Sequence, residues 1–170
     1  MSATLQPALP NPLDEQAERL MRRLCDRDLT IATAESCTGG MLAALLTDIE
    51  GAGHAFERGF VTYTKESKTE LLGVEAELLE HNEAVSEPVA RALAEGALNR
   101  SKADLALGVT GFAGPAGDGC EEGLVHMALA RRGSPTRHRV EHFGAAGRGR
   151  VRVQSLKAML EMLEDALEEA

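Results

Sequence analysis

The sequence is poor in aromatic residues, which make up 3 % of its 170 residues. It contains no tryptophan and a single tyrosine, Tyr63. This scarcity disfavours a nucleic-acid-binding domain that stacks bases on aromatic rings. Basic residues are also few: 18 lysines and arginines stand against 27 acidic residues, a net charge of −9. Binders of nucleic acids or anionic membranes need a basic surface to neutralise phosphates, so we expect neither partner.

Long apolar runs and paired cysteines are also absent from the sequence. No segment approaches the ~20 apolar residues of a membrane-spanning helix, and residues 1–12 lack the basic and apolar regions of a signal peptide. The cysteines Cys25, Cys37 and Cys120 lie far apart, with no histidine nearby at metal-ligand spacing. The sequence therefore predicts a cytoplasmic protein that needs no disulfide or metal to fold.

Apolar periodicity predicts one α/β domain over residues 13–170, after a flexible leader over residues 1–12. We expect strands at residues 30–34, 60–64, 104–109, 123–130 and 136–143. We expect helices at residues 13–26, 41–46, 65–72, 75–80, 86–100 and 151–167. Strands that alternate with helices are typical of a central sheet with helices on both faces.

Two glycine-rich loops follow predicted strands, after Ala34 and after Val109. Ligands of such sheets bind at the carboxyl ends of the strands, so we expect the chemistry in these two loops. The second loop, over residues 110–119, is flexible enough to wrap a ligand. It matches no named nucleotide-binding motif, and a plain connection between strands would look the same.

The first loop places Ser36 at a turn between a strand and a helix, before Thr38, Gly39 and Gly40. This corner suits a serine nucleophile whose oxyanion is held by the amides of residues 38–40. It equally suits phosphate binding at the start of a helix. A third interpretation is structural: a helix cap, with glycines that allow close packing. The residues alone do not decide between these three.

A serine nucleophile needs a base, and none of the five scattered histidines is obviously placed to serve. A lysine in a dry pocket can lose its proton near neutral pH, and Lys65 and Lys68 could share one helix face. The alternative is a solvated helix start with Glu66 as ion-pair partner. Seven of the 18 basic residues are arginines between positions 131 and 152. They could bind a phosphorylated small molecule or simply solvate a strand edge and a helix start.

Taken in order, several segments resemble the C-terminal domain of the CinA competence/damage-inducible proteins. They are Ala34-Glu-Ser-Cys-Thr-Gly-Gly40, Gly59-Phe-Val-Thr-Tyr63 with Lys68, Leu71-Leu-Gly-Val74, Ala84-Val-Ser-Glu-Pro88 and Val109-Thr-Gly-Phe-Ala-Gly-Pro115. The resemblance covers about residues 14–168 and is closest to the stand-alone form of that domain. It implies a three-layer α/β/α sandwich around a mixed, mostly parallel central sheet, and a homo-oligomer.

The same resemblance implies an amidohydrolase that converts nicotinamide mononucleotide (NMN) to nicotinic acid mononucleotide and ammonia, without a metal or other cofactor. Ser36 lies at the catalytic serine of the family, Lys68 at its catalytic lysine and Tyr63 at a further position of the site. The resemblance also implies substrate binding by Thr110, Gly111, Gly114 and Arg148. Among these, Arg148 is expected to hold the 5′-phosphate, and Thr110 with the Gly111 amide could assist it. The amides of residues 38–40 are expected to hold the oxyanion, although the two loops could exchange these roles.

Three departures from the family pattern stand out. Lys65 replaces the usual asparagine and could add positive charge beside Lys68; Ala146-Gly147-Arg148 has lost a carboxylate; and the loop over residues 116–122 is short and carries Cys120. None of these departures changes Ser36 or Lys68. The competing function is a non-catalytic nucleotide-binding or regulatory module linked to competence or the DNA damage response, as the family name suggests.

Overall fold

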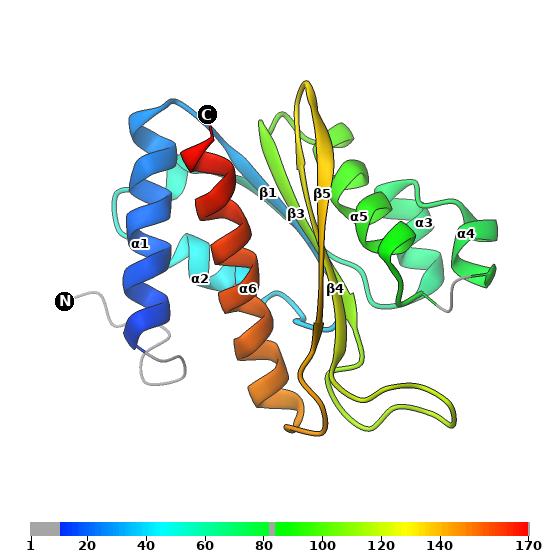
Figure 1. Ribbon diagram of the computed structural model, residues 1–170. Coiled ribbons are helices and arrows are strands. Elements are labelled where there is room, and N and C mark those ends of the chain that lie inside the picture. Colours follow the sequence, from blue (N-terminus) through cyan, green and yellow to red (C-terminus); the bar gives the residue numbers. More distant parts are fainter. Residues whose placement is uncertain (1–10, 82–83, 170) are drawn as a thin grey trace.

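The structure, a computed structural model, describes residues 11–81 and 84–169 (Figure 1). The helices are α1 (Asn11–Asp26), α2 (Met41–Thr47), α3 (Lys65–Leu72), α4 (Ala76–His81), α5 (Glu87–Asn99) and α6 (Arg148–Glu168), with a 3₁₀ turn, η1, over Gly53–Ala55. The strands are β1 (Ile31–Glu35), β2 (Phe56–Val61), β3 (Leu105–Gly111), β4 (Leu124–Arg131) and β5 (Ser134–His142).

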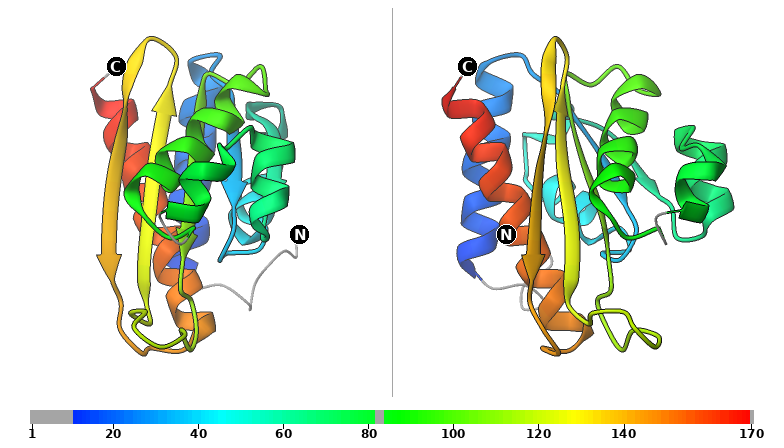
Figure 2. Two further views of the ribbon diagram at one scale, coloured as in Figure 1. Left: turned by 90° about the vertical axis from the view of Figure 1, so that its right-hand side faces the viewer. Right: turned by 45° about the vertical axis from the view of Figure 1, so that its right-hand side comes forward.

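The five strands form one mixed sheet in the order β2-β1-β3-β4-β5. Strand β1 pairs in parallel with β2 and β3, whereas β4 is antiparallel to both β3 and β5. Four strands therefore run in one direction and only β4 opposes them. Helices α1, α2 and α6 cover one face of the sheet, and α3, α4 and α5 cover the other (Figures 1 and 2). The predicted three-layer sandwich with a mostly parallel sheet is confirmed.

Each face of the sheet has its own apolar core, because side chains alternate along each strand. On β3, Leu107 packs toward α1 and α6, whereas Gly108 lies against α5. A Cβ atom at Gly108 would lie 2.6 Å from the Ala94 nitrogen and 2.9 Å from the Ala90 oxygen. The missing side chain lets the backbone of α5 rest directly on the sheet.

Two expected elements differ from the structure. The second strand covers residues 56–61 instead of 60–64, because Thr64 already caps α3 by accepting a hydrogen bond from the Ser67 nitrogen at 3.1 Å. The first helix begins at Asn11, since proline is tolerated in a first helical turn and Pro12 does not delay it. Residues 11 and 12 therefore belong to α1, and the rest of the expected leader, residues 1–10, lies outside the described residues.

The topology brings the two glycine-rich loops together. Glu35, the last residue of β1, pairs with Val109 of β3, and the Ser36 nitrogen donates to the Val109 oxygen at 3.2 Å. The carboxyl ends of two parallel neighbours thus meet at one edge of the sheet, as predicted. Within the described residues, none of the helices combines the length and apolar character needed to cross a bilayer.

Candidate active site

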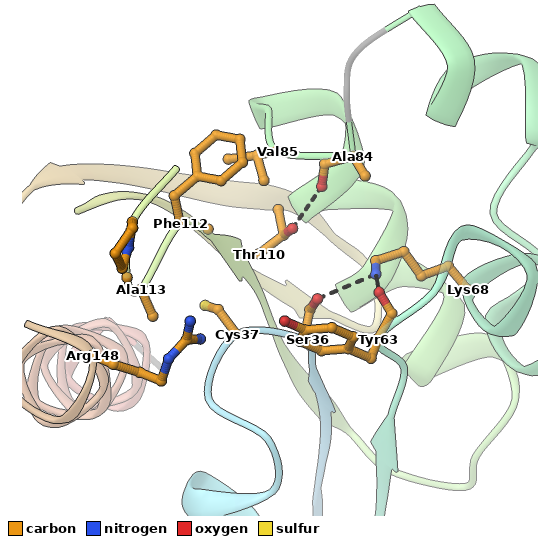
Figure 3. A pocket seen from close by; sticks show the side chains of 13 residues that line it. Ser36, Cys37, Tyr63, Lys68, Ala84, Val85, Thr110, Phe112, Ala113 and Arg148 are labelled. Carbon is orange, nitrogen blue, oxygen red and sulfur yellow. Dashed lines mark hydrogen bonds between the residues drawn. The ribbon is translucent and has the colours of Figure 1, made fainter. Parts of the chain in front are cut away.

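A cavity of about 230 Å³ opens at the carboxyl ends of β1 and β3 (Figure 3). Its walls come from the two loops, from the segments before α3 and α5, and from the start of α6. The lining residues are Ser36, Cys37, Tyr63, Lys68, Ala84, Val85, Thr110, Gly111, Phe112, Ala113, Gly114, Pro115 and Arg148. The structure therefore brings Ser36, Lys68, Tyr63, Thr110, Gly111, Gly114 and Arg148, all candidates from the sequence, to one cavity.

Lys68 is buried, with 1 % of its surface exposed, at the floor of this cavity. Its Nζ atom lies 3.2 Å from the Ser36 Oγ atom, 3.1 Å from the Thr62 carbonyl oxygen and 2.9 Å from the Tyr63 carbonyl oxygen. No carboxylate is among these three partners. Burial lowers the pKa of the Lys68 ammonium below its ordinary value, because the charged form loses its hydration.

Lys65 lies on the same helix as Lys68 but has a different environment. Its Nζ atom is 3.3 Å from Glu80 Oε1 of α4 in an exposed ion pair. Lys65 is therefore engaged outside the cavity, and the expectation that its charge acts on Lys68 is not met. The shifted pKa of Lys68 comes instead from its burial.

Two nucleophilic side chains, Ser36 and Cys37, are adjacent in the cavity wall. Burial raises the pKa of the Cys37 thiol to about 12. The sulfur therefore carries its proton at neutral pH, and thiols react as nucleophiles through the thiolate. Ser36, which shares a hydrogen bond with an amine of lowered pKa, is the better candidate nucleophile.

The structure does not bring Thr38, Gly39 and Gly40 to the cavity. The Thr38 hydroxyl and the Gly40 amide donate to the Glu35 carboxylate at 2.7 and 3.1 Å, and the Gly39 amide donates to the Ser36 carbonyl at 3.2 Å. These donors already have acceptors within the chain. The Gly39 and Gly40 amides are therefore engaged within the chain, and residues 38–40 are not among those that line the cavity, so the structure does not support the expected oxyanion or phosphate site there.

The opposite wall comes from the second loop. The Thr110 side chain is buried and donates to the Ala84 carbonyl at 2.6 Å, so its hydroxyl fixes the segment before α5. Gly111 ends β3 at the cavity edge. A Cβ atom at Gly114 would lie 2.8 Å from a terminal guanidinium nitrogen of Arg148. The absence of a side chain at position 114 therefore makes room for the arginine.

Of the seven clustered arginines, Arg148 is the one that lines the cavity. It is the first residue of α6, and its guanidinium points toward the cavity near Cys37 (Figure 3). Most of the others bond to neighbouring elements. Three of them donate to main-chain carbonyls: Arg131 to Ala166, Arg132 to Ala103 and Leu98, and Arg152 to Cys37. Two form ion pairs: Arg137 with Glu169, and Arg139 with both Glu141 and Glu161. The cluster is thus mainly structural, and Arg148 is its member that lines the cavity.

Sequence reasoning gave no role to several lining residues, notably Val85, Phe112 and Pro115. Each lies within one of the segments that carry the family resemblance, which is the signal that could have found it. All five histidines lie among the described residues, and none of them lines the cavity. The cavity therefore offers no histidine as a base for Ser36. His126 and His138 instead stack on each other, with ring centres 5.3 Å apart. Across residues 11–81 and 84–169, no cluster of three histidine, cysteine or carboxylate side chains is arranged for a metal ion.

Curated proteins with similar sequences carry CinA-like or competence-damage-inducible names. A CinA-like protein of Akkermansia muciniphila is 53 % identical over 116 residues, which are 67 % of this chain and 28 % of that protein. Across eight curated relatives, the matching segment is 27–38 % of the relative's length. The chain thus spans well under half of these longer proteins.

Solved structures match over almost the whole chain. The competence/damage-inducible protein CihA from Agrobacterium tumefaciens has a TM-score of 0.90 and 41 % identity, covering 94 % of this chain and 98 % of that one. A CinA superfamily protein from Escherichia coli has a TM-score of 0.85 and 35 % identity, covering 92 % of both chains. The sequence model of the family described as the CinA C-terminal domain matches residues 13–167 of this chain. The chain therefore belongs to the CinA C-terminal domain family.

Proposed function

We propose that this protein is a serine–lysine amidohydrolase that converts NMN and water to nicotinic acid mononucleotide and ammonia. The observation that carries the proposal is the buried Lys68 amine, 3.2 Å from the Ser36 hydroxyl at a cavity that Arg148 also lines. A hydroxyl beside an amine of lowered pKa is the arrangement that activates a serine without a histidine. Arg148 supplies a cation for a substrate phosphate.

The hydrogen-bond partners of Lys68 suit a neutral amine. A neutral amine has two N–H donors and one lone pair. The two N–H groups can serve the Thr62 and Tyr63 carbonyls, which only accept. The lone pair is then left for the third partner, the Ser36 hydroxyl 3.2 Å away, from which a neutral amine can accept a hydrogen bond. The carbonyls orient the amine, so Tyr63 supports the base through its main chain.

The reaction then follows in two halves. As the Ser36 oxygen attacks the carboxamide carbon, its proton passes to Lys68, and the protonated Lys68 gives this proton to the departing ammonia. This leaves a nicotinoyl ester on Ser36. Water attacks the ester by the reverse route and releases the acid. Cys37 directly follows the nucleophile and lines the cavity, so its amide is our candidate oxyanion donor, as in other serine hydrolases.

The decisive experiment is ammonia release from NMN by the purified protein, with Ser36→Ala as control. Rapid release that the Ser36→Ala variant lacks supports the proposal. Binding of NMN without any release by the unaltered protein favours the non-catalytic regulatory module instead. A cytoplasmic location, a homo-oligomeric state and independence from metals and cofactors remain predictions of the family resemblance and the sequence.

A further inference from the structure

A buried carboxylate directly before the proposed nucleophile has no part in the mechanism above. Glu35 ends β1, and its side chain is 0 % exposed. Its Oε2 atom accepts hydrogen bonds from the Thr38 hydroxyl at 2.7 Å, the Gly40 amide at 3.1 Å and the Leu42 amide at 3.0 Å. Its Oε1 atom accepts from the Ala43 amide at 2.8 Å. Four donors therefore converge on one carboxylate, as its burial requires.

These bonds close the start of α2. The N-cap residue is Gly40, which has no side chain to cap the first amides of the helix. Glu35 supplies the missing acceptor from five positions upstream, and its negative charge suits the positive end of the helix. The helix start is therefore filled by the chain's own anion.

The turn that carries Ser36 needs such a restraint. Gly39 and Gly40 have φ angles of +63° and +95°, and glycine can adopt many other conformations. At its first residue the turn is fixed to β3, because the Ser36 amide donates to the Val109 carbonyl at 3.2 Å. At its far end, the Glu35 carboxylate ties the turn to the strand from which it leaves.

We propose that Glu35 is a positioning residue, whose carboxylate holds the turn so that the Ser36 hydroxyl stays within hydrogen-bond distance of the Lys68 amine. This inference rests on the proposed function, since it assigns Glu35 a part in that reaction. It predicts that loss of the carboxylate weakens catalysis more than binding, because Arg148 and the second loop remain in place. Small displacements of reacting groups cost about 100-fold in rate.

The test is Glu35→Ala, with Asp104→Ala as a matched control. The Asp104 carboxylate accepts from the Thr30 amide at 2.8 Å and from the Thr30 hydroxyl at 3.0 Å, next to the opposite end of β1. Both variants lose a carboxylate that anchors β1, but only Glu35 contacts the turn that carries Ser36. At temperatures where both are folded, we expect kcat to fall about 10- to 100-fold in Glu35→Ala with KM little changed. Asp104→Ala should keep its kcat within about twofold of the unaltered protein.

Formate provides a second readout. In Glu35→Ala the four donors around the lost carboxylate are free, and a small carboxylate of the same charge can accept from them. Formate should restore part of kcat in Glu35→Ala and should do nothing for Ser36→Ala. A Glu35→Ala variant with kcat within twofold of the unaltered protein overturns the inference. So does formate that raises Tm without raising kcat, since the carboxylate would then be purely structural.

A serine-directed phosphonate, followed by mass spectrometry of the Ser36 peptide, separates this inference from the substrate assignment. If the unaltered protein releases no ammonia from NMN but reacts with the phosphonate at Ser36, the substrate proposal fails. The role of Glu35 is then tested by the rate at which the phosphonate labels Ser36. Slower labelling in Glu35→Ala than in Asp104→Ala then supports the positioning role, and equal rates refute it. If the unaltered protein does neither, Ser36 is not a nucleophile and both proposals fall.

Discussion

The Lys68 Nζ atom lies 3.2 Å from the Ser36 Oγ atom, although 32 positions separate the two residues in the sequence. Ser36 follows the interior strand β1, and Lys68 comes from α3, which follows the neighbouring edge strand β2. The parallel pairing of these strands brings the two residues together. Both residues line the cavity that Arg148 also lines.

Replacing Ser36 with alanine should abolish ammonia release and leave NMN binding nearly unchanged. The substitution removes the attacking oxygen but leaves the second loop and Arg148 in place. Ammonia assays and calorimetric titration with NMN measure the two effects separately. Lost binding with residual turnover would mean that Ser36 holds substrate instead of attacking it.

Replacing Lys68 with methionine should lower kcat by about 100- to 10,000-fold, the usual contribution of a general base. In the unaltered protein, kcat should rise with pH, because only the neutral amine accepts the Ser36 proton. The midpoint should lie below the ordinary lysine pKa, since burial lowers the pKa of Lys68. A pH profile of kcat tests this, and a near-normal rate in Lys68→Met would assign the base elsewhere.

The same lowered pKa should make stability depend on pH. Between the folded pKa of Lys68 and its higher unfolded pKa, the unfolded chain binds more protons than the native protein. Raising the pH through this window therefore stabilises the native state. Lys68→Met lacks this contribution. Urea unfolding across the window should show the unaltered protein gaining stability relative to Lys68→Met as pH rises, and a constant difference would contradict a lowered pKa.

Replacing Arg148 with alanine should raise KM for NMN about 10- to 100-fold, since a charge-assisted hydrogen bond contributes about 1.5–3 kcal/mol. The change should matter little for nicotinamide riboside, which has no phosphate. Arg150→Ala is the matched control, because Arg150 is an exposed neighbour on α6 that does not line the cavity. Equal effects on both substrates would rule out phosphate binding by Arg148.

Gly114→Ala tests the same contact without removing the arginine. A Cβ atom there would lie 2.8 Å from the Arg148 guanidinium, which is the mobile end of a side chain and can move aside. We expect a higher KM for NMN with a nearly unchanged Tm. Gly117→Ala in the same loop would place its Cβ atom more than 4 Å from every residue except its chain neighbours, and should change neither quantity. A raised KM in both variants would point to the loop backbone instead of Arg148.

Much of the site was predictable because its residues lie in short motifs next to strand ends. Ser36 follows an apolar strand, and Thr110 and Gly111 end another, so the topological rule for α/β sheets placed both at one edge. The strand before Lys68 was misplaced, because β2 is an edge strand whose Glu57 and Arg58 lack an apolar pattern. The structure does not support the expected oxyanion role of Gly40, whose amide donates to Glu35, and no local sequence pattern shows which acceptor a helix amide will find.

By itself, the sequence determined the layered α/β architecture, through its alternating apolar periodicities, and the family, through its motifs. Only the tertiary structure decided how the charged groups are used. It buried Lys68 beside Ser36 and turned Lys65 away to Glu80. It also filled the start of α2 with Glu35. Apolar patterns are local, whereas the desolvation of an amine and the partner of a carboxylate depend on residues that only folding brings near.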